Sequence, residues 1–143
     1  MESSISIYRS IRRLYRMNQK YSSANMEHPD LTPAEFQLLR HVGFHREVSQ
    51  RHLAEDLNVD KAMISRTLQK LESKGYLIRR EDEADARSKK VLALPPAKEI
   101  HLQGRGLSER FFDSLTEEFS PEELALLESL LERMVKKGRE ICL

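Results

Sequence analysis

Hydrophobic residues recur along most of the chain at the spacing of helices that bury one face. Near the N-terminus, Ile7, Ile11, Leu14 and Tyr21 stand at offsets of 0, 4, 7 and 14 residues, and basic side chains occupy much of the remaining surface. This spacing predicts an amphipathic helix. The polar stretch at residues 27–30 contains a proline and is expected to end that helix.

A second helix is predicted to begin at residues 32–35, which read Thr-Pro-Ala-Glu. The threonine can cap the helix, the proline suits its first position, and the glutamate completes a capping box. Phe36, Leu39 and Val42 then fall on the side that we expect to be buried, and Gly43 is expected to end the helix.

Two further helices are predicted in the middle of the chain, joined by a short turn. Ser49 can cap a short third helix that carries Leu53 and Leu57 on one face, and Asp60 can cap the fourth. Asn58 stands in the turn at a position where glycine is common. After glycine, asparagine best tolerates the left-handed backbone conformation that such a turn needs.

The fourth helix spans residues 60–74 and buries apolar residues at offsets of 0, 4 and 7 from Ile64. Gly75, a typical helix-stopping residue, is expected to end it. The pattern then changes, because residues 76–80 and 90–94 are short and β-prone and enclose a polar, charged loop. This arrangement predicts a β-hairpin.

Two long helices complete the chain, one from about residue 97 to 119 and the other opened by a second capping box at residues 120–123. The predicted order is therefore α-α-α-α-β-β-α-α, a mostly α fold with a small β-hairpin (α+β). The last helix is rich in leucine, and its apolar arc is wider than one contact face needs. Because the helices at both ends are too apolar to stand alone, we expect a second copy of the chain to pair with them.

The central pair of helices, residues 49–74, forms a predicted helix-turn-helix. Its second helix would lie in a major groove and present short or polar residues to base edges and phosphates. The candidate DNA contacts on this motif are Ser49, Lys61, Ala62, Met63, Ser65, Arg66, Gln69 and Lys70. A helix pair of this kind also arises from plain packing, so the motif alone leaves DNA binding open.

The hairpin that follows the fourth helix strengthens the case for DNA binding. Its candidate contacts are the basic residues Arg79, Arg80, Arg87, Lys89 and Lys90. A projecting basic hairpin can reach the phosphate backbone or the minor groove, where arginine fits well, and would make the motif a winged helix-turn-helix. The opposing interpretation is an ordinary solvated loop, because four acidic residues share the segment.

The composition is compatible with a DNA-binding protein and indicates its cellular compartment. The chain has 143 residues, of which 39% are apolar and 33% charged, enough for one compact domain. Its net charge of +1 says little, but residues 60–90 carry a balance of +3 and residues 99–143 one of −4. Such a distribution suits a protein that presents one face to a polyanion. A single cysteine, no apolar run long enough to cross a membrane and no signal-peptide pattern favour the reducing cytoplasm.

Several motifs are similar to those of the multiple-antibiotic-resistance regulator (MarR) family. They are Leu31-Thr-Pro-Ala-Glu-Phe36, His52-Leu-Ala-Glu-Asp-Leu57, Met63-Ile-Ser-Arg-Thr-Leu68, Leu71-Glu-Ser-Lys-Gly-Tyr-Leu77 and Asp85-Ala-Arg-Ser88. The resemblance in element order covers nearly the whole chain, and the most specific motif is the Asp-x-Arg of the hairpin.

The resemblance implies roles for the hairpin residues. Arg87 would enter the minor groove, and Asp85 would hold the wing in shape, partly through salt bridges. Members of the family often carry a second arginine shortly after the first. Here Lys89 or Lys90 stands in its place, which implies a looser wing contact.

The resemblance also implies a bacterial homodimeric repressor of a pseudo-palindromic operator, released by a small ligand that is often aromatic and anionic. By this resemblance, one structural domain would consist of three parts: an N-terminal dimerisation helix (1–30), a DNA-binding lobe (31–96) and C-terminal dimerisation helices (97–143). The ligand would lie between the dimer helices and the DNA-binding lobe. Candidate pocket residues are Tyr15, Phe36, Arg40, His41, Phe44 and Phe111.

The histidines raise the alternative of metal sensing. His41 and His45 stand four residues apart on one predicted helix, a spacing that can hold a metal, and Glu47, His52 and His101 could add ligands. No His-x-x-x-His pattern recurs in the fifth helix, where a second half of a site would help. We therefore expect ordinary surface histidines, with no metal and no cofactor.

Redox sensing, catalysis and protein binding are the remaining alternatives. Cys142 could sense oxidants or link two subunits, but it is the second residue from the end of the chain. The sequence has no glycine-rich phosphate loop, nucleophile elbow or paired carboxylate in an apolar setting, so we expect no enzyme. A winged helix that serves only protein–protein contacts is the stronger rival, since a fold does not fix a function. Such a module, however, needs no basic residues around one surface.

Overall fold

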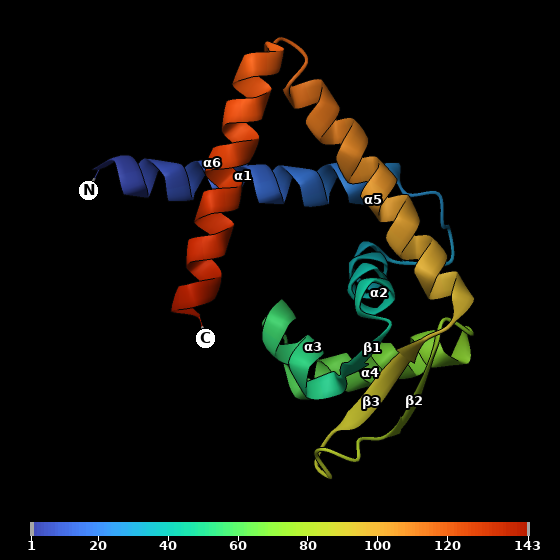
Figure 1. Ribbon diagram of the computed structural model, residues 1–143. Coiled ribbons are helices and arrows are strands. Elements are labelled where there is room, and N and C mark those ends of the chain that lie inside the picture. The colour runs from blue at the N-terminus through green and yellow to red at the C-terminus, as the bar shows by residue number, and fades with distance from the viewer. Residues whose placement is uncertain (1, 143) are drawn as a thin grey trace. The chain divides into compact units, whose positions relative to one another are not determined.

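The computed structural model describes residues 2–142. Its elements are α1 (Glu2–Asn25), α2 (Pro33–His45), β1 (Glu47–Ser49), α3 (Gln50–Leu57), α4 (Lys61–Ser73), β2 (Leu77–Glu81), β3 (Lys89–Ala93), α5 (Pro95–Leu115) and α6 (Pro121–Ile141). This is the predicted mostly helical fold with a hairpin, and it contains one strand more than expected (Figure 1). The chain divides into two compact units, Met1–Ser108 and Glu109–Leu143, which are described separately below.

Local capping chemistry sets the start of two helices where the sequence predicted them. The Thr32 hydroxyl accepts a hydrogen bond from the Glu35 backbone N–H at 3.2 Å, and the Glu35 carboxylate accepts one from the Thr32 N–H at 3.0 Å. Ser120 and Glu123 form the same reciprocal box at the start of α6, with both bonds at 3.1 Å. Each box satisfies two backbone donors that a helix start otherwise leaves free.

The prediction that Gly43 ends the second helix is wrong. Helix α2 continues to His45, and the next residue, Arg46, has a positive φ of 65°. Gly43 is instead needed for packing, because a Cβ built on it would collide with the backbone carbonyl of Ala97 in α5. The glycine thus marks a close approach of two helices and not a helix end.

A three-stranded antiparallel sheet replaces the two-stranded hairpin of the prediction. Its strand order is β1-β3-β2, with Val48 opposite Val91 and Arg79 opposite Val91 on the other side. Strand β1 is only three residues long, and only its central residue is apolar. Three residues are too few for an alternation from which a strand can be recognised. Strand β1 links the hairpin to the start of α3.

The core of the first unit lies where α2, α3, α4 and the sheet meet. Phe36, Leu53, Leu68, Leu77 and Val91, one or two from each of these elements, are fully buried. The hairpin extends beyond these helices at the lower end of the view (Figure 1). The helix-turn-helix is therefore fixed to a packed core, while the hairpin projects from it.

The turn of the helix-turn-helix has the predicted conformation. Asn58 is left-handed, with φ 51° and ψ 48°, and the Val59 backbone N–H donates to the Ala54 carbonyl at 3.0 Å. Gly75, just beyond α4, has a φ of 84°. The expected cap at Asp60 differs, because this residue occupies the N-cap position but its side chain makes no capping hydrogen bond.

Apolar side chains remain uncovered in both units. Helix α6 buries no residue, and in α1 only Ser22 is buried. Within the second unit, the end of α5 and helix α6 border a concavity of about 1080 Å³ whose lining includes Phe112, Leu127 and Leu131. None of the described helices combines the length and the apolar character that crossing a lipid bilayer requires.

Candidate nucleic-acid interface

Helix α4 turns its polar side away from the core. Ile64, Leu68 and Leu71 are buried and hold the helix against the lobe. The opposite side is exposed except for Ser65, which is half-buried, and it carries the predicted contacts Lys61, Ala62, Met63, Ser65, Arg66, Gln69 and Lys70. Met63, the largest apolar residue among them, is 52% exposed. All seven residues thus lie outside the buried stripe of α4.

Arg79 is not on this open surface. Its side chain is only 10% exposed, and its Nε lies 3.4 Å from Glu72 Oε1. Its guanidinium also donates to Gln50 and to Ser65, both at 3.4 Å. Arg79 therefore connects the first strand of the hairpin to α3 and α4, which makes it an internal anchor in this structure.

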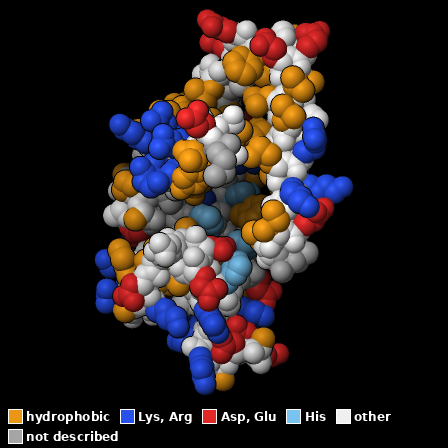
Figure 2. Space-filling model, turned by 90° about the vertical axis from the view of Figure 1, so that its left-hand side faces the viewer, with side chains coloured by type: hydrophobic (Ala, Val, Ile, Leu, Met, Phe, Trp, Pro, Cys, Tyr) orange, Lys and Arg blue, Asp and Glu red, His pale blue; other side chains and the backbone are white. Residues whose placement is uncertain are grey.

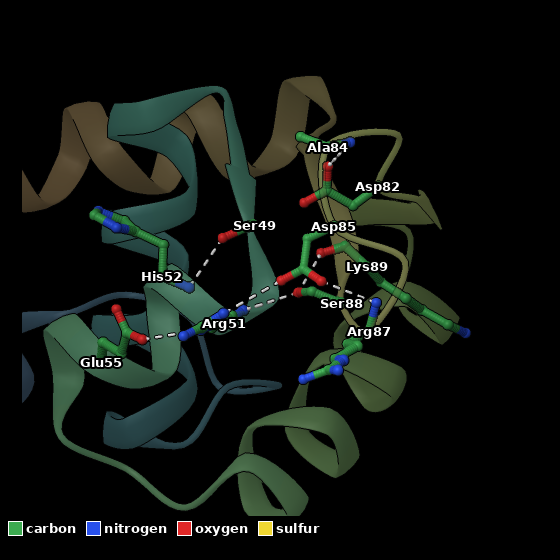
Figure 3. A network of polar contacts seen from close by, with 10 residues as sticks. All are labelled: Ser49, Arg51, His52, Glu55, Asp82, Ala84, Asp85, Arg87, Ser88 and Lys89. Carbon is green, nitrogen blue, oxygen red and sulfur yellow. Dashed lines mark hydrogen bonds and ion pairs between the residues drawn. The ribbon is translucent and has the colours of Figure 1, made fainter.

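Asp85 is the centre of a polar network at the tip of the hairpin (Figure 3). Its Oδ1 accepts a hydrogen bond from the Arg87 backbone N–H at 3.0 Å, and its Oδ2 lies 3.4 Å from Arg51 of α3. Ser88 adds a second link, since its hydroxyl accepts from the Arg51 backbone N–H at 3.2 Å. The Arg87 N–H, followed by Arg51, lowers the pKa of the Asp85 carboxyl below its usual value. The tip is therefore tied to the start of α3.

Arg87 itself projects from the tip with its side chain exposed. Among residues 2–142 no acidic side chain forms an ion pair with its guanidinium. A groove of about 370 Å³ lies beside it, between the tip of the hairpin and the starts of α3 and α4. Its lining residues are Gln50, Arg51, Lys61, Ile64, Ser65, Asp85, Arg87, Ser88 and Lys89.

Glu47 of β1 arranges two of the predicted basic contacts. Its carboxylate lies 2.9 Å from Lys90 Nζ and 3.8 Å from the Arg80 guanidinium. The Lys90 hydrogen bond lowers the pKa of Glu47, and the charge of Arg80 adds to the effect. Side chains of both signs accordingly crowd the hairpin end of the molecule (Figure 2). This role of Glu47 was not foreseen, because it depends on the unpredicted strand β1.

The remaining predicted contacts have simple surroundings. Ser49 uses its hydroxyl to cap α3, accepting from the His52 backbone N–H at 3.0 Å. Lys89 begins β3 and is exposed. Arg51, which no pattern singled out, is the residue that joins α3 to the hairpin tip. Its spacing of four residues from Glu55, with which it pairs at 3.1 Å, was the only available signal.

A second cavity, of about 400 Å³, lies in the first unit between α1, α2, α3 and α5. Four of the predicted pocket residues, Tyr15, Arg40, His41 and Phe44, line it. Phe36 does not, because it is fully buried in the core. Phe111 belongs to the second unit, where its ring lies 5.6 Å from that of Phe112.

Arg40 gives this cavity a half-buried positive charge. Its guanidinium donates to Ser108 at 2.9 Å and to Ser22 at 3.4 Å. No acidic side chain among the described residues forms an ion pair with it. Burial lowers the pKa of Arg40, yet arginine stays charged in proteins. Gly104 leaves room for the side chain, since a Cβ there would overlap it.

Other residues of the cavity were not predicted. Asn18, Gln19, Gln37, Asp56 and His101 also line it. The Oδ1 of Asn18 is buried and has no hydrogen-bond partner among the described residues, which is costly unless a ligand or water supplies one. Apart from His101, which the sequence suggests as a possible metal ligand, nothing in the sequence pattern distinguishes these polar residues from ordinary surface positions.

Comparison with known proteins agrees with this geometry. The family model described as "MarR family" matches residues 30–88, which span α2, the helix-turn-helix, strand β2 and the loop that follows it. A Bacillus cereus protein named an uncharacterized HTH-type transcriptional regulator is 29% identical over 134 residues, 90% of this chain and 86% of its own. The Bacillus subtilis (strain 168) HTH-type regulator YdgJ is 35% identical over 88 residues, 62% of this chain and 54% of its own.

Solved structures match almost the whole chain. A MarR transcriptional regulator from Methanosarcina mazei Go1 has a TM-score of 0.73 and 27% identity, covering 94% of this chain and 97% of that one. The apo form of MarR from E. coli, at 24% identity and a TM-score of 0.71 over 88% of this chain and 93% of its own, supports the fold. The relatives are transcriptional regulators and not enzymes, as the sequence predicts. Residues 30–88 of this chain are thus similar to the MarR family of transcriptional regulators, and the fold is the one seen in solved MarR regulators.

Proposed function

We propose that this regulator is a homodimer that binds double-stranded DNA through α4 and the β2–β3 hairpin and represses transcription from a pseudo-palindromic operator. One observation carries the proposal. The exposed Arg87 guanidinium stands at the tip of a hairpin that Asp85, Ser88 and Arg51 hold to the helix-turn-helix, beside the polar face of α4. A helix face for the major groove and an arginine for the minor groove are thus carried on one lobe.

The uncovered apolar surface supports a dimer. Large apolar side chains of residues 112–135 line the concavity of the second unit or stand exposed beside it, and α1 leaves Ile5, Ile7 and Tyr8 about half exposed. Clustered apolar side chains such as those around the concavity mark an interaction site. A second copy of the chain is the proposed occupant, and two-fold symmetry would then set two copies of α4 roughly 10 base pairs apart.

The cavity around Arg40 supports a small anionic effector. A half-buried guanidinium whose partners are two hydroxyl groups can form charge-assisted hydrogen bonds with a carboxylate. Tyr15 and Phe44 offer aromatic surfaces nearby, and the volume of about 400 Å³ suits a small aromatic acid. We propose that such a ligand releases the regulator from its operator.

The decisive experiment measures DNA affinity by fluorescence anisotropy, on a fragment that the protein selects from the genome of its host. Arg87→Ala should weaken binding by roughly 1–3 kcal/mol while the protein stays folded, and wild-type affinity should fall steeply with added salt. Lys98→Ala, which removes one exposed positive charge from α5 outside α4 and the hairpin, is the matched control and should change little. If neither variant differs from wild type, the proposed wing contact is wrong.

The same experiment separates DNA binding from the rival role as a protein–protein module. A module that binds only proteins would select no genomic fragment reproducibly. Its affinity for any duplex would also show no dependence on Arg87. A reproducible fragment with salt-sensitive affinity would exclude that role.

A further inference from the structure

Two histidines and an aspartate meet between the end of α2 and one side of α3. His45 comes from α2, and His52 and Asp56 stand one turn apart on α3. Their ligand atoms all lie within 4.8 Å of one another. His52 Nε2 is 3.0 Å from Asp56 Oδ2, and the rings of His45 and His52 are 5.7 Å apart and nearly perpendicular. Histidine side chains accordingly gather on one face of the molecule (Figure 2).

The chain reversal after α2 creates this meeting. Arg46 adopts a positive φ of 65°, the short strand β1 follows, and the Ser49 cap starts α3 in a new direction. His45 is half-buried, whereas His52 and Asp56 are exposed. The sequence pattern paired His41 with His45 and named Glu47, His52 and His101 as possible further ligands. Of these, the structure places His52 beside His45, and it adds Asp56, which no pattern indicated.

We propose that His45, His52 and Asp56 bind a divalent transition metal of the zinc class. Two imidazoles and a carboxylate form a nitrogen and oxygen donor set that Zn²⁺ accepts. Bond lengths of about 2.0–2.2 Å in a tetrahedral site place ligand atoms about 3.3 Å apart. Rotation of the exposed side chains of His52 and Asp56 can bring the present spread of up to 4.8 Å to that value.

Three protein ligands leave one coordination position for water. That position would lie at the edge of the Arg40 cavity, because His45 and Asp56 both line it. His41, one turn before His45 on α2, lines the same cavity. The ion would join α2, which belongs to the packed core, to α3, the first helix of the helix-turn-helix. Metal binding would thereby stabilise one placement of α3.

The alternative is a simple ion pair between His52 and Asp56, with His45 as a bystander. Such a pair would need no third residue and would give no measurable affinity for a metal. Removing metal from the full-length protein with a chelator and titrating Co²⁺ tests the two cases. The expected result is one Co²⁺ per chain, with the visible absorption of a four-coordinate ion, displaced by Zn²⁺.

Variants identify the ligands. His52→Ala and Asp56→Asn should each weaken Co²⁺ and Zn²⁺ binding by at least about tenfold, since even outer-shell changes cost that much. His28→Ala removes an imidazole from outside the cluster and should bind as wild type does. Cys142→Ser, which removes the exposed thiol, should also leave the affinity unchanged. The proposal would be overturned if wild type bound no Co²⁺ or Zn²⁺ at micromolar concentration. Equal metal affinities of His52→Ala and His28→Ala would also overturn it.

Thermal unfolding gives a second readout and checks the fold of each variant. Zn²⁺ should raise the Tm of wild type and of His28→Ala, and should leave that of His52→Ala unchanged. Metal-free variants should melt cooperatively, because the two altered α3 side chains are exposed. Neither measurement involves DNA, so failure of the metal site and failure of the proposed DNA binding are distinguishable.

Discussion

Asp85 is an acidic residue on a surface proposed to meet a polyanion. Through-space electrostatics alone would make its charge a disadvantage, since it repels phosphate. Its contacts suggest the opposite effect, because it holds the Arg87 backbone and pairs with Arg51. The two effects can be separated by removing the charge while keeping the shape of the side chain.

We expect Asp85→Asn to weaken DNA binding, although it makes the hairpin less negative. The asparagine would lose the ion pair to Arg51 and hold the tip less firmly. Glu83→Gln is the matched control, since it removes the same charge from the same loop and should leave affinity unchanged or slightly higher. Anisotropy titrations of both variants decide the matter, and tighter binding by Asp85→Asn would contradict the supporting role.

Tyr76 is expected to make the free energy of unfolding fall with rising pH in the alkaline range. Its hydroxyl donates to Asp30 Oδ2 at 2.9 Å, and burial, followed by this bond, raises the pKa of Tyr76 to about 12. The unfolded chain loses the same proton near pH 10. Between about pH 10 and 12 the folded form therefore binds more protons than the unfolded chain. The stabilisation that Tyr76 contributes is complete below about pH 10 and is lost as the pH rises toward 12. The free energy of unfolding in denaturant should fall more steeply over this window for wild type than for Tyr76→Phe.

At the scale of elements, substitution of two glycines by alanine provides a matched pair of tests of helix packing. Gly43→Ala should destabilise the protein by roughly 1–3 kcal/mol, because its Cβ would meet the Ala97 carbonyl and neither helix backbone can yield easily. Gly106→Ala, inside α5 with open space around it, should stabilise by about 0.5–1 kcal/mol. Urea unfolding of the two variants measures both changes. A neutral Gly43→Ala would show that α2 and α5 are not held so closely.

The elements also show what sequence can and cannot predict. The capping boxes, the left-handed Asn58 and the stop at Gly75 were predictable because their causes lie within a few residues of chain. Gly43, Arg79 and strand β1 were not, since each depends on a partner distant in sequence. The same division holds at the site. The exposed face of α4 followed from helical spacing, whereas the roles of Arg51 and Glu47 required the folded sheet.

At the scale of the whole molecule, the proposed dimer makes the oligomeric state a direct test. Leu131→Glu places a charge in the apolar concavity of the second unit and should convert a dimer of about twice 16.7 kDa into monomers. Ala125→Glu adds the same charge to α6 outside that lining and should remain dimeric. Sedimentation velocity at micromolar concentration measures both. A monomeric wild type would remove the basis for two symmetric half-sites.

The Arg40 cavity and the groove at the hairpin tip, both in the first unit, have no lining residue in common. One is built around Arg40 from α1, α2, α3 and α5, and the other lies between the hairpin tip and the starts of α3 and α4. Under the proposed function, mutations can therefore alter the recognised chemical signal while the recognised DNA sequence stays the same, and the converse also holds. Duplicated copies of such a gene could diverge toward new signals or new promoters in independent steps. The same independence would let an engineer retune the chain as a biosensor by changing only the walls of the Arg40 cavity.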